Sequence, residues 1–224
     1  METPLDRELR ALKELLLTMA GEVEQQLSHA IRALVERDSE AAQKVIAEDQ
    51  RVDAREKEVD RKAIEIILRE RPLAAPLRMV VAATKIAPDL ERVADHAVNI
   101  AEQALKLNTM PQLKPFVTLP RMAELAGQMV EEAVTAFVEQ DAGKARAVIS
   151  RDDVVDALHE EVFRELLTYM MSEPKTIPRA LALLLVARSL ERIADQATNI
   201  AEQVVYLVEG QDIRHLHGEG PGRG

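Results

Sequence analysis

The sequence contains no cysteine and no tryptophan, and only 2% of its 224 residues are aromatic. The lack of cysteine excludes disulfides, thiol nucleophiles and thiolate metal sites. The scarcity of aromatic residues makes stacking platforms for bases or sugars improbable, and it also disfavours a β-sandwich fold. Basic charge is scarce as well, because 29 Lys and Arg stand against 39 Asp and Glu, a formal net charge of −10. Nucleic acid is therefore not an expected partner, since binding its backbone needs a clustered basic face.

Long apolar runs are also missing. The longest, residues 180–187, is far shorter than the roughly 20 residues that span a bilayer. The N-terminal stretch METPLDRELR has no apolar signal core. We therefore expect a soluble, cytoplasmic protein that does not insert into a membrane.

Glycine is confined mainly to the C-terminal end, where five of the eight glycines lie at or beyond position 210. The rest is rich in good helix formers, and apolar residues between Leu90 and Leu107 recur with the i, i+3, i+4, i+7 spacing of a helix. This pattern predicts an all-α fold. Prolines divide it into six helices, with N-caps at Asp38 and Asp141, a kink at Pro88 and a flexible tail over 209–224. The predicted helices are about 5–36, 39–70, 77–108, 119–139, 142–172 and 178–208.

An internal repeat is the strongest signal of organisation. The segment LERVADHAVNIAEQALKL (90–107) returns as LERIADQATNIAEQVVYL (190–207), with 12 of 18 positions identical. Upstream, nine residues between positions 33 and 53 recur 103 positions later. The chain is therefore expected to be a tandem duplication of three-helix bundles, over 5–112 and 118–208, related by a pseudo-twofold axis.

Acidic residues form a stripe on the last helix of each half. On a helix, the first stripe spans an arc of about 80° roughly opposite the apolar positions, so we expect it to face outward. Its members are Glu91, Asp95, Asn99 and Glu102, repeated as Glu191, Asp195, Asn199 and Glu202. A neighbouring helix in each half adds a pair of aspartates. The first pair is Asp49 and Asp53, followed by Glu56, and the second is Asp152 and Asp156, followed at the matching position by His159.

Two interpretations of these stripes are open. They could be solvated faces, with Arg92 and Arg192 offsetting part of the charge. Alternatively, three to five carboxylate oxygens near one point would suit a hard cation such as Fe³⁺, Mn²⁺, Mg²⁺ or Ca²⁺. Like charges at i and i+4 repel and destabilise a helix. A solvated face gives no reason to keep such pairs in both halves, so their repetition favours the second interpretation.

The two LER blocks, with their upstream D-x3-D pairs, resemble the PhoU family of bacterial phosphate-transport regulators over residues 5–208. The resemblance implies two three-helix bundles. It also implies metal at paired E(D)xxxD motifs, as multinuclear iron or as divalent cations such as Zn, Mn, Ni or Mg. The implied ligands are Asp49, Asp53, Glu91 and Asp95 in the first half, and Asp152, Asp156, Glu191 and Asp195 in the second. Ala94, Ala194 and Gln196 depart from the family pattern of Gly, Gly and His. The small alanines should preserve the packing, whereas Gln196 and the expected kink at Pro88 predict two inequivalent sites.

The same resemblance implies a non-enzymatic regulator of phosphate uptake and of the phosphate-starvation response. Its implied partners are the ATPase of the phosphate ABC transporter, a sensor histidine kinase and a second copy of the chain. The absence of any E-x-x-H motif, Gly-rich phosphate loop or nucleophile–base arrangement agrees with a protein that is not an enzyme. The alternatives are a carboxylate-cluster metal-binding or storage protein, a phosphate-permease accessory protein and a plain helical scaffold.

Overall fold

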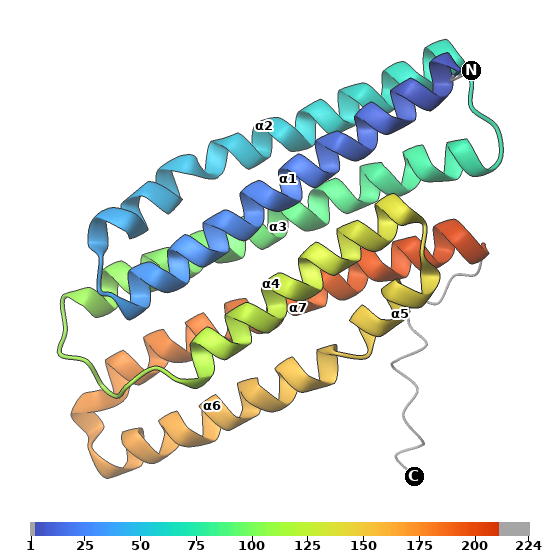
Figure 1. The fold of residues 1–224 in the computed structure, drawn as a ribbon. Helices are drawn as coiled ribbons and strands as arrows, with labels where there is room; N and C mark the ends of the chain where they lie inside the picture. The colour runs from blue at the N-terminus through green and yellow to red at the C-terminus, as the bar shows by residue number, and fades with distance from the viewer. Residues whose placement is uncertain (1–2, 211–224) are drawn as a thin grey trace, which may run out of the picture.

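The computed structural model describes residues 3–210, and every regular element in that range is helical (Figure 1). The first half contains α1 (Pro4–Val35), α2 (Ser39–Glu70) and α3 (Ala75–Asn108). The second contains α4 (Thr118–Glu139), α5 (Ala142–Ile149), α6 (Asp152–Ser172), the 3₁₀ turn η1 (Pro174–Thr176) and α7 (Ile177–Glu209). All-α architecture is confirmed. Most of the tail expected over 209–224 lies outside the described residues.

The prediction of a single fifth helix over 142–172 is wrong. The segment is divided into α5 and α6 at Ser150 and Arg151, where the backbone changes to shorter-range hydrogen bonds. The Arg151 amide donates to the Val148 carbonyl at 2.9 Å, and the Arg151 guanidinium donates to Glu132 of α4 at 2.8 Å. The interruption therefore coincides with a contact to another helix, and α2 has no such break in the first half.

Both predicted aspartate N-caps are confirmed. Asp38 accepts from the amides of Glu40 and Ala41, each at 3.0 Å, and Asp141 accepts from Lys144 at 3.0 Å. Each carboxylate satisfies amides that lack an intrahelical partner in the first turn. α3 continues through Pro88, so the proline does not end the helix, and the kink expected there stays a prediction.

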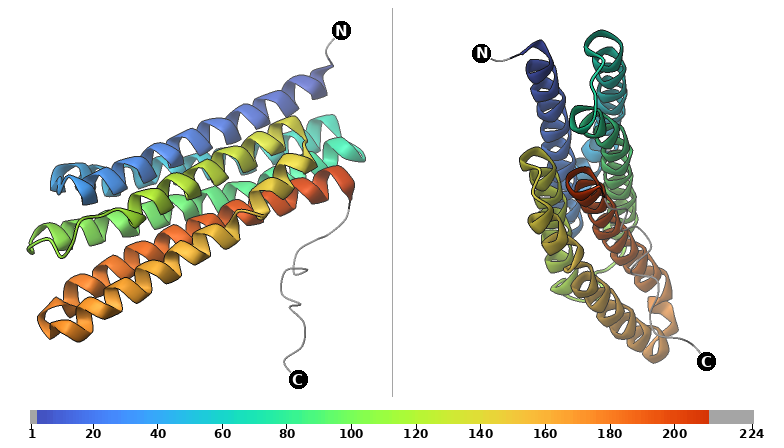
Figure 2. Two further views of the ribbon diagram at one scale, coloured as in Figure 1. Left: turned by 60° about the horizontal axis from the view of Figure 1, so that its bottom comes forward. Right: turned by 90° about the vertical axis from the view of Figure 1, so that its right-hand side faces the viewer.

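The two halves pack through their last helices. α3 lies against α1, α2 and α7, while α7 lies against α3, α4, α5 and α6 (Figures 1 and 2). α1 also packs against α4. The central helices α3 and α7 run antiparallel and contribute many buried alanines, whose small side chains let neighbouring helices approach closely. Among residues 3–210 no helix has the length and apolarity required to span a bilayer.

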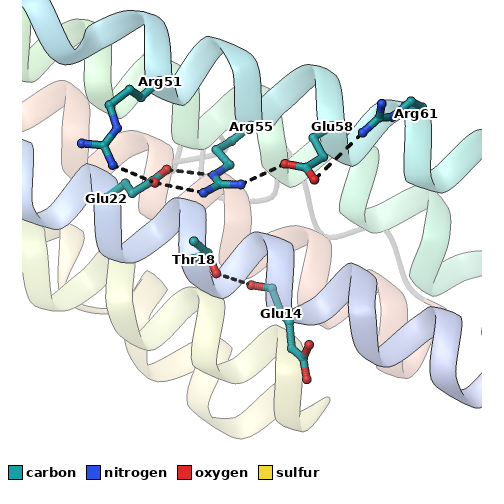
Figure 3. A network of polar contacts seen from close by, with 7 residues as sticks. All are labelled: Glu14, Thr18, Glu22, Arg51, Arg55, Glu58 and Arg61. Carbon is teal, nitrogen blue, oxygen red and sulfur yellow. Dashed lines mark hydrogen bonds and ion pairs between the residues drawn. The ribbon is translucent and has the colours of Figure 1, made fainter.

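A network of ion pairs joins α2 to α1 on the outer face of the first half (Figure 3). Glu22 of α1 lies 3.3 Å from Arg55 and 3.8 Å from Arg51 of α2, and Arg55 also donates to Glu58 at 2.9 Å. The positions 103 residues after Glu22, Arg51 and Arg55 are occupied by Leu125, Val154 and Leu158. The second half therefore cannot form the corresponding network.

Replacing Glu22→Gln is expected to lower the free energy of unfolding by up to about 1 kcal/mol, because one carboxylate pairs with two partly exposed guanidinium groups. Urea unfolding measures this loss, which should shrink in high salt. Glu24→Gln, at an exposed position of the same helix, is the matched control and should have no effect. Equal losses in the two variants would contradict the assignment.

Candidate metal centres

The first carboxylate cluster lies where α2 packs against α3. It consists of Asp49, Asp53 and Glu56 on α2 with Glu91 and Asp95 on α3. Burial raises the pKa of Asp49, and the charges of Asp53 and Asp95 raise it further. Burial likewise raises the pKa of Glu91, with additions from Asp95, Glu56, Asp53 and Asp49. The structure therefore brings all four predicted ligands of the first half into one electrostatic neighbourhood.

The second carboxylate cluster occupies the corresponding place between α6 and α7. It consists of Asp152, Asp156 and His159 on α6 with Glu191 and Asp195 on α7. Burial raises the pKa of Asp152 to about 7, with the charges of Asp156 and Asp195 as the next causes. The pKa values of Asp156 and Glu191 are raised by burial and then by Asp195, and His159 lowers both. All four predicted ligands of the second half thus lie together.

Two carboxylate oxygens of the second cluster are buried and accept no hydrogen bond: Oδ1 of Asp152 and Oε2 of Glu191, one from each of the two facing helices. Glu191 Oε2 lies 3.4 Å from Nε of Arg192, so its charge is partly compensated, whereas Asp152 Oδ1 has neither a hydrogen bond nor an ion pair with any described residue. A buried oxygen without a partner is uncommon, because its lost hydration is normally replaced by a hydrogen bond or an ion. An all-oxygen donor set of this kind fits a hard cation.

The two clusters differ in their counterions. Arg192 donates to Asp195 at 2.7 Å and lies 3.4 Å from Glu191, so the second cluster contains its own cation. Arg92, at the equivalent position, instead donates to Asp89 at 3.1 Å. Asp89 is buried, and this burial raises its pKa to about 6. Sequence reasoning missed Asp89, because it lies outside the acidic stripe and directly after Pro88.

The carboxylates form facing rows rather than a completed coordination shell. Within residues 3–210, no three His, Asp or Glu side chains are arranged so that they could hold one metal ion in this conformation. Side chains on both helices would have to rotate toward a shared cation. The rows have the composition of a cation site, and metal ligation by their members stays a prediction.

The rest of the stripe differs between the halves. Asn99, Glu102 and Asn199 are exposed as expected, but Glu202 is 9% exposed, so its predicted outward position is wrong. Glu202 lines a cleft with Arg146 and Ser150, beside the interruption between α5 and α6. α5, which packs on α7, contributes Arg146 and Ile149 to this cleft and so covers Glu202.

Among the histidines, His159 belongs to the second cluster. His96 is half-buried, and its Nδ1 atom is buried in the cleft where α3 meets α7. His215 and His217 lie outside the described residues.

Comparison with known proteins agrees with the internal repeat. The PhoU domain model matches the chain twice, over residues 16–104 and 119–204. The phosphate-specific transport system accessory protein PhoU homolog of Aquifex aeolicus is 42% identical over 95% of this chain and 96% of its own length. The phosphate-specific transport system accessory protein PhoU of Escherichia coli is 38% identical over 95% of this chain and 88% of its own length.

Solved structures agree with the same assignment. The crystal structure of PhoU from Pseudomonas aeruginosa matches with a TM-score of 0.87 at 38% identity, covering 92% of this chain and 99% of that one. The matches extend through both halves, including the helices that carry the two clusters. The chain therefore belongs to the PhoU family.

Proposed function

We propose that this chain is a non-enzymatic regulator of phosphate uptake and of the phosphate-starvation response. The observation that carries the proposal is the near full-length match to proteins named phosphate-specific transport system accessory proteins. It would act in the cytoplasm, as a homodimer, by contact with the ATPase of the phosphate ABC transporter and with a sensor histidine kinase.

Exposed apolar side chains support a role in protein–protein contact. Ile64 and Leu68 are 58% and 70% exposed near the end of α2, and their counterparts 103 positions later are Leu167 and Met171, 42% and 78% exposed on α6. A soluble helix gains nothing from exposing large apolar side chains at equivalent places in both halves. Such surfaces are typical of sites that bind other proteins.

A binding experiment and a gene deletion together test the proposed regulatory function. Purified chain should retain both the transporter ATPase and the cytosolic part of the kinase in a pull-down, and deletion of the gene should raise phosphatase expression in high phosphate. The apolar pair Leu68→Ser and Met171→Ser should weaken retention, because both side chains are mostly exposed and contribute little to the core. Failure to retain either partner, with unchanged phosphatase expression, would count against regulation.

We further propose that the two clusters bind cations, with Asp49, Asp53, Glu91 and Asp95 as ligands in the first and Asp152, Asp156, Glu191 and Asp195 in the second. Bound cations would offset repulsion between the carboxylates and tie α2 to α3 and α6 to α7. Iron, Mn²⁺ or Mg²⁺ suits carboxylate oxygens better than Zn²⁺ or Ni²⁺. A storage protein is the alternative, and a metal stoichiometry far above two small clusters per chain would favour it.

The double variant Asp95→Asn/Asp195→Asn separates cation sites from solvated faces. Metal at one hundred times Kd stabilises a fold by about 2.7 kcal/mol per site. The wild type should therefore show a metal-dependent rise in Tm that the variant lacks. The metal-free variant should melt no lower than wild type, because the like-charge pairs removed offset the loss of the partly exposed Arg192–Asp195 pair. Calorimetry with Fe, Mn or Zn measures both. Equal metal-dependent rises in Tm for the wild type and the variant would show that the stripes are solvated faces and not cation sites.

Stability of the metal-free protein should also depend on pH through Asp152. The folded chain keeps this proton up to about pH 7, whereas unfolded aspartate loses it near 3.8. The folded state binds more protons in this window, so the free energy of unfolding falls as pH rises through it. Asp152→Asn should flatten that decline in urea titrations, whereas Asp60→Asn, at an exposed position of α2, should not. An unchanged slope in Asp152→Asn would refute the assignment.

A further inference from the structure

A cleft of about 380 Å³ lies along the seam between α3 and α7. The α3 side contributes His96, Asn99 and Gln103, and the α7 side contributes Leu185, Arg188, Ser189 and Arg192. Its lining includes two guanidinium groups and no carboxylate, in a chain whose net charge is −10. The cleft is therefore a local exception to the acidic surface around it.

Several polar groups of this cleft have no partner within residues 3–210. Arg188 is exposed and makes no ion pair or hydrogen bond through its side chain. Ser189 is only 8% exposed, and its hydroxyl likewise bonds to none of the described residues. His96 Nδ1 and Gln103 Oε1 are buried without a hydrogen bond. The Gln103 oxygen is an acceptor, so this side chain would present its amide nitrogen to an anion. Polar groups arranged around a cleft and left unsatisfied are typical of a ligand site.

The duplication supplies an internal comparison for this cleft. On the equivalent side of the seam, Asp89 and Pro88 occupy the positions that Ser189 and Arg188 occupy here. Asp89 is buried and accepts a hydrogen bond from Arg92, so that side contains its own anion. The cleft replaces this carboxylate with a hydroxyl and adds a guanidinium. A negative group from outside the chain would restore the balance.

We propose that the cleft binds a phosphoryl oxyanion, either inorganic phosphate or the phosphate group of a larger molecule. The planar fork of Arg188 can pair with two oxygens of a tetrahedral anion, while the Ser189 hydroxyl and the amides of Asn99 and Gln103 can donate to the others. Arg192 adds positive charge but already pairs with Asp195 and Glu191. Choosing phosphate as the oxyanion rests on the proposed function.

The nearest acids set the conditions under which this site works. Asp95 and Asp195 both act electrostatically on His96, so they oppose an anion in the cleft. Cations in the carboxylate clusters would reduce that opposition, which couples phosphate binding to metal binding without requiring the metal to ligate the anion.

Calorimetric titration of the full chain tests the site, with orthophosphate, ATP and sulfate as separate probes, before and after removal of metal with a chelator. Arg188→Gln and Ser189→Asp should each weaken phosphate binding by at least about tenfold, because one removes a charge-assisted donor and the other places a carboxylate in the cleft. Arg121→Gln, which removes one exposed charge from α4, is the matched control and should bind like wild type. Circular dichroism checks that each variant is folded.

The outcomes are distinct. Weakened binding in both cleft variants with an unchanged control supports the site, and tighter ATP binding lost in the same variants identifies the oxyanion as part of a larger ligand. Removal of metal should weaken phosphate binding by the wild type, because the carboxylates then oppose the anion. Equal affinities in all variants, or no binding at millimolar probe to the metal-loaded chain, would overturn the proposal. If phosphate binds but deletion of the gene leaves phosphatase expression unchanged, the phosphate site is supported and the regulatory function is not. If the chain binds no phosphate and Arg188→Gln still regulates phosphatase expression normally, the regulatory function is supported and the phosphate site is not.

Discussion

The central constraint of this structure is that α3 and α7 are covered by other helices on most sides and yet carry rows of carboxylates. α3 packs against α1, α2 and α7, and Glu91 and Asp95 lie on its α2 side. There it meets Asp49 and Asp53, and α7 meets Asp152 and Asp156 in the same way. Burial and mutual repulsion raise the pKa values of Glu91 and Glu191, which means that the charged form of each cluster is disfavoured in the chain alone. This unfavourable arrangement is the physical basis for proposing cations.

Duplication has placed similar clusters in two halves whose surroundings differ. The first half binds α2 to α1 through Glu22 and its two arginines, while the second half has a broken helix and an arginine inside its cluster. A cation entering the second cluster would compete with Arg192 for Asp195, whereas the first cluster has no such pairing. We therefore expect the two sites to differ in affinity, so that one responds to a change in conditions before the other.

The sequence predicted those features that depend on local pattern. Helix periodicity, proline positions and the caps Asp38 and Asp141 identified the helices, and the repeat identified the duplication. It failed where a contact between distant segments decides the outcome. The break between α5 and α6 lies where Arg151 contacts Glu132 of another helix, and Glu202 is buried where α5 packs on α7. The LER motifs are identical, yet Arg92 and Arg192 take different partners because Asp89 is replaced by Ser189 in the second half.

Anomalous diffraction from crystals soaked in Mn²⁺ tests the central claim most directly, because it places the cation relative to the helices. Peaks are expected at both clusters, one at Asp49, Asp53, Glu91 and Asp95, and one at Asp152, Asp156, Glu191 and Asp195. Arg192 should move away from Asp195 in the occupied second site. Crystals that show no manganese at either cluster, or manganese only at histidines of the C-terminal segment, would contradict the assignment of the clusters as metal centres.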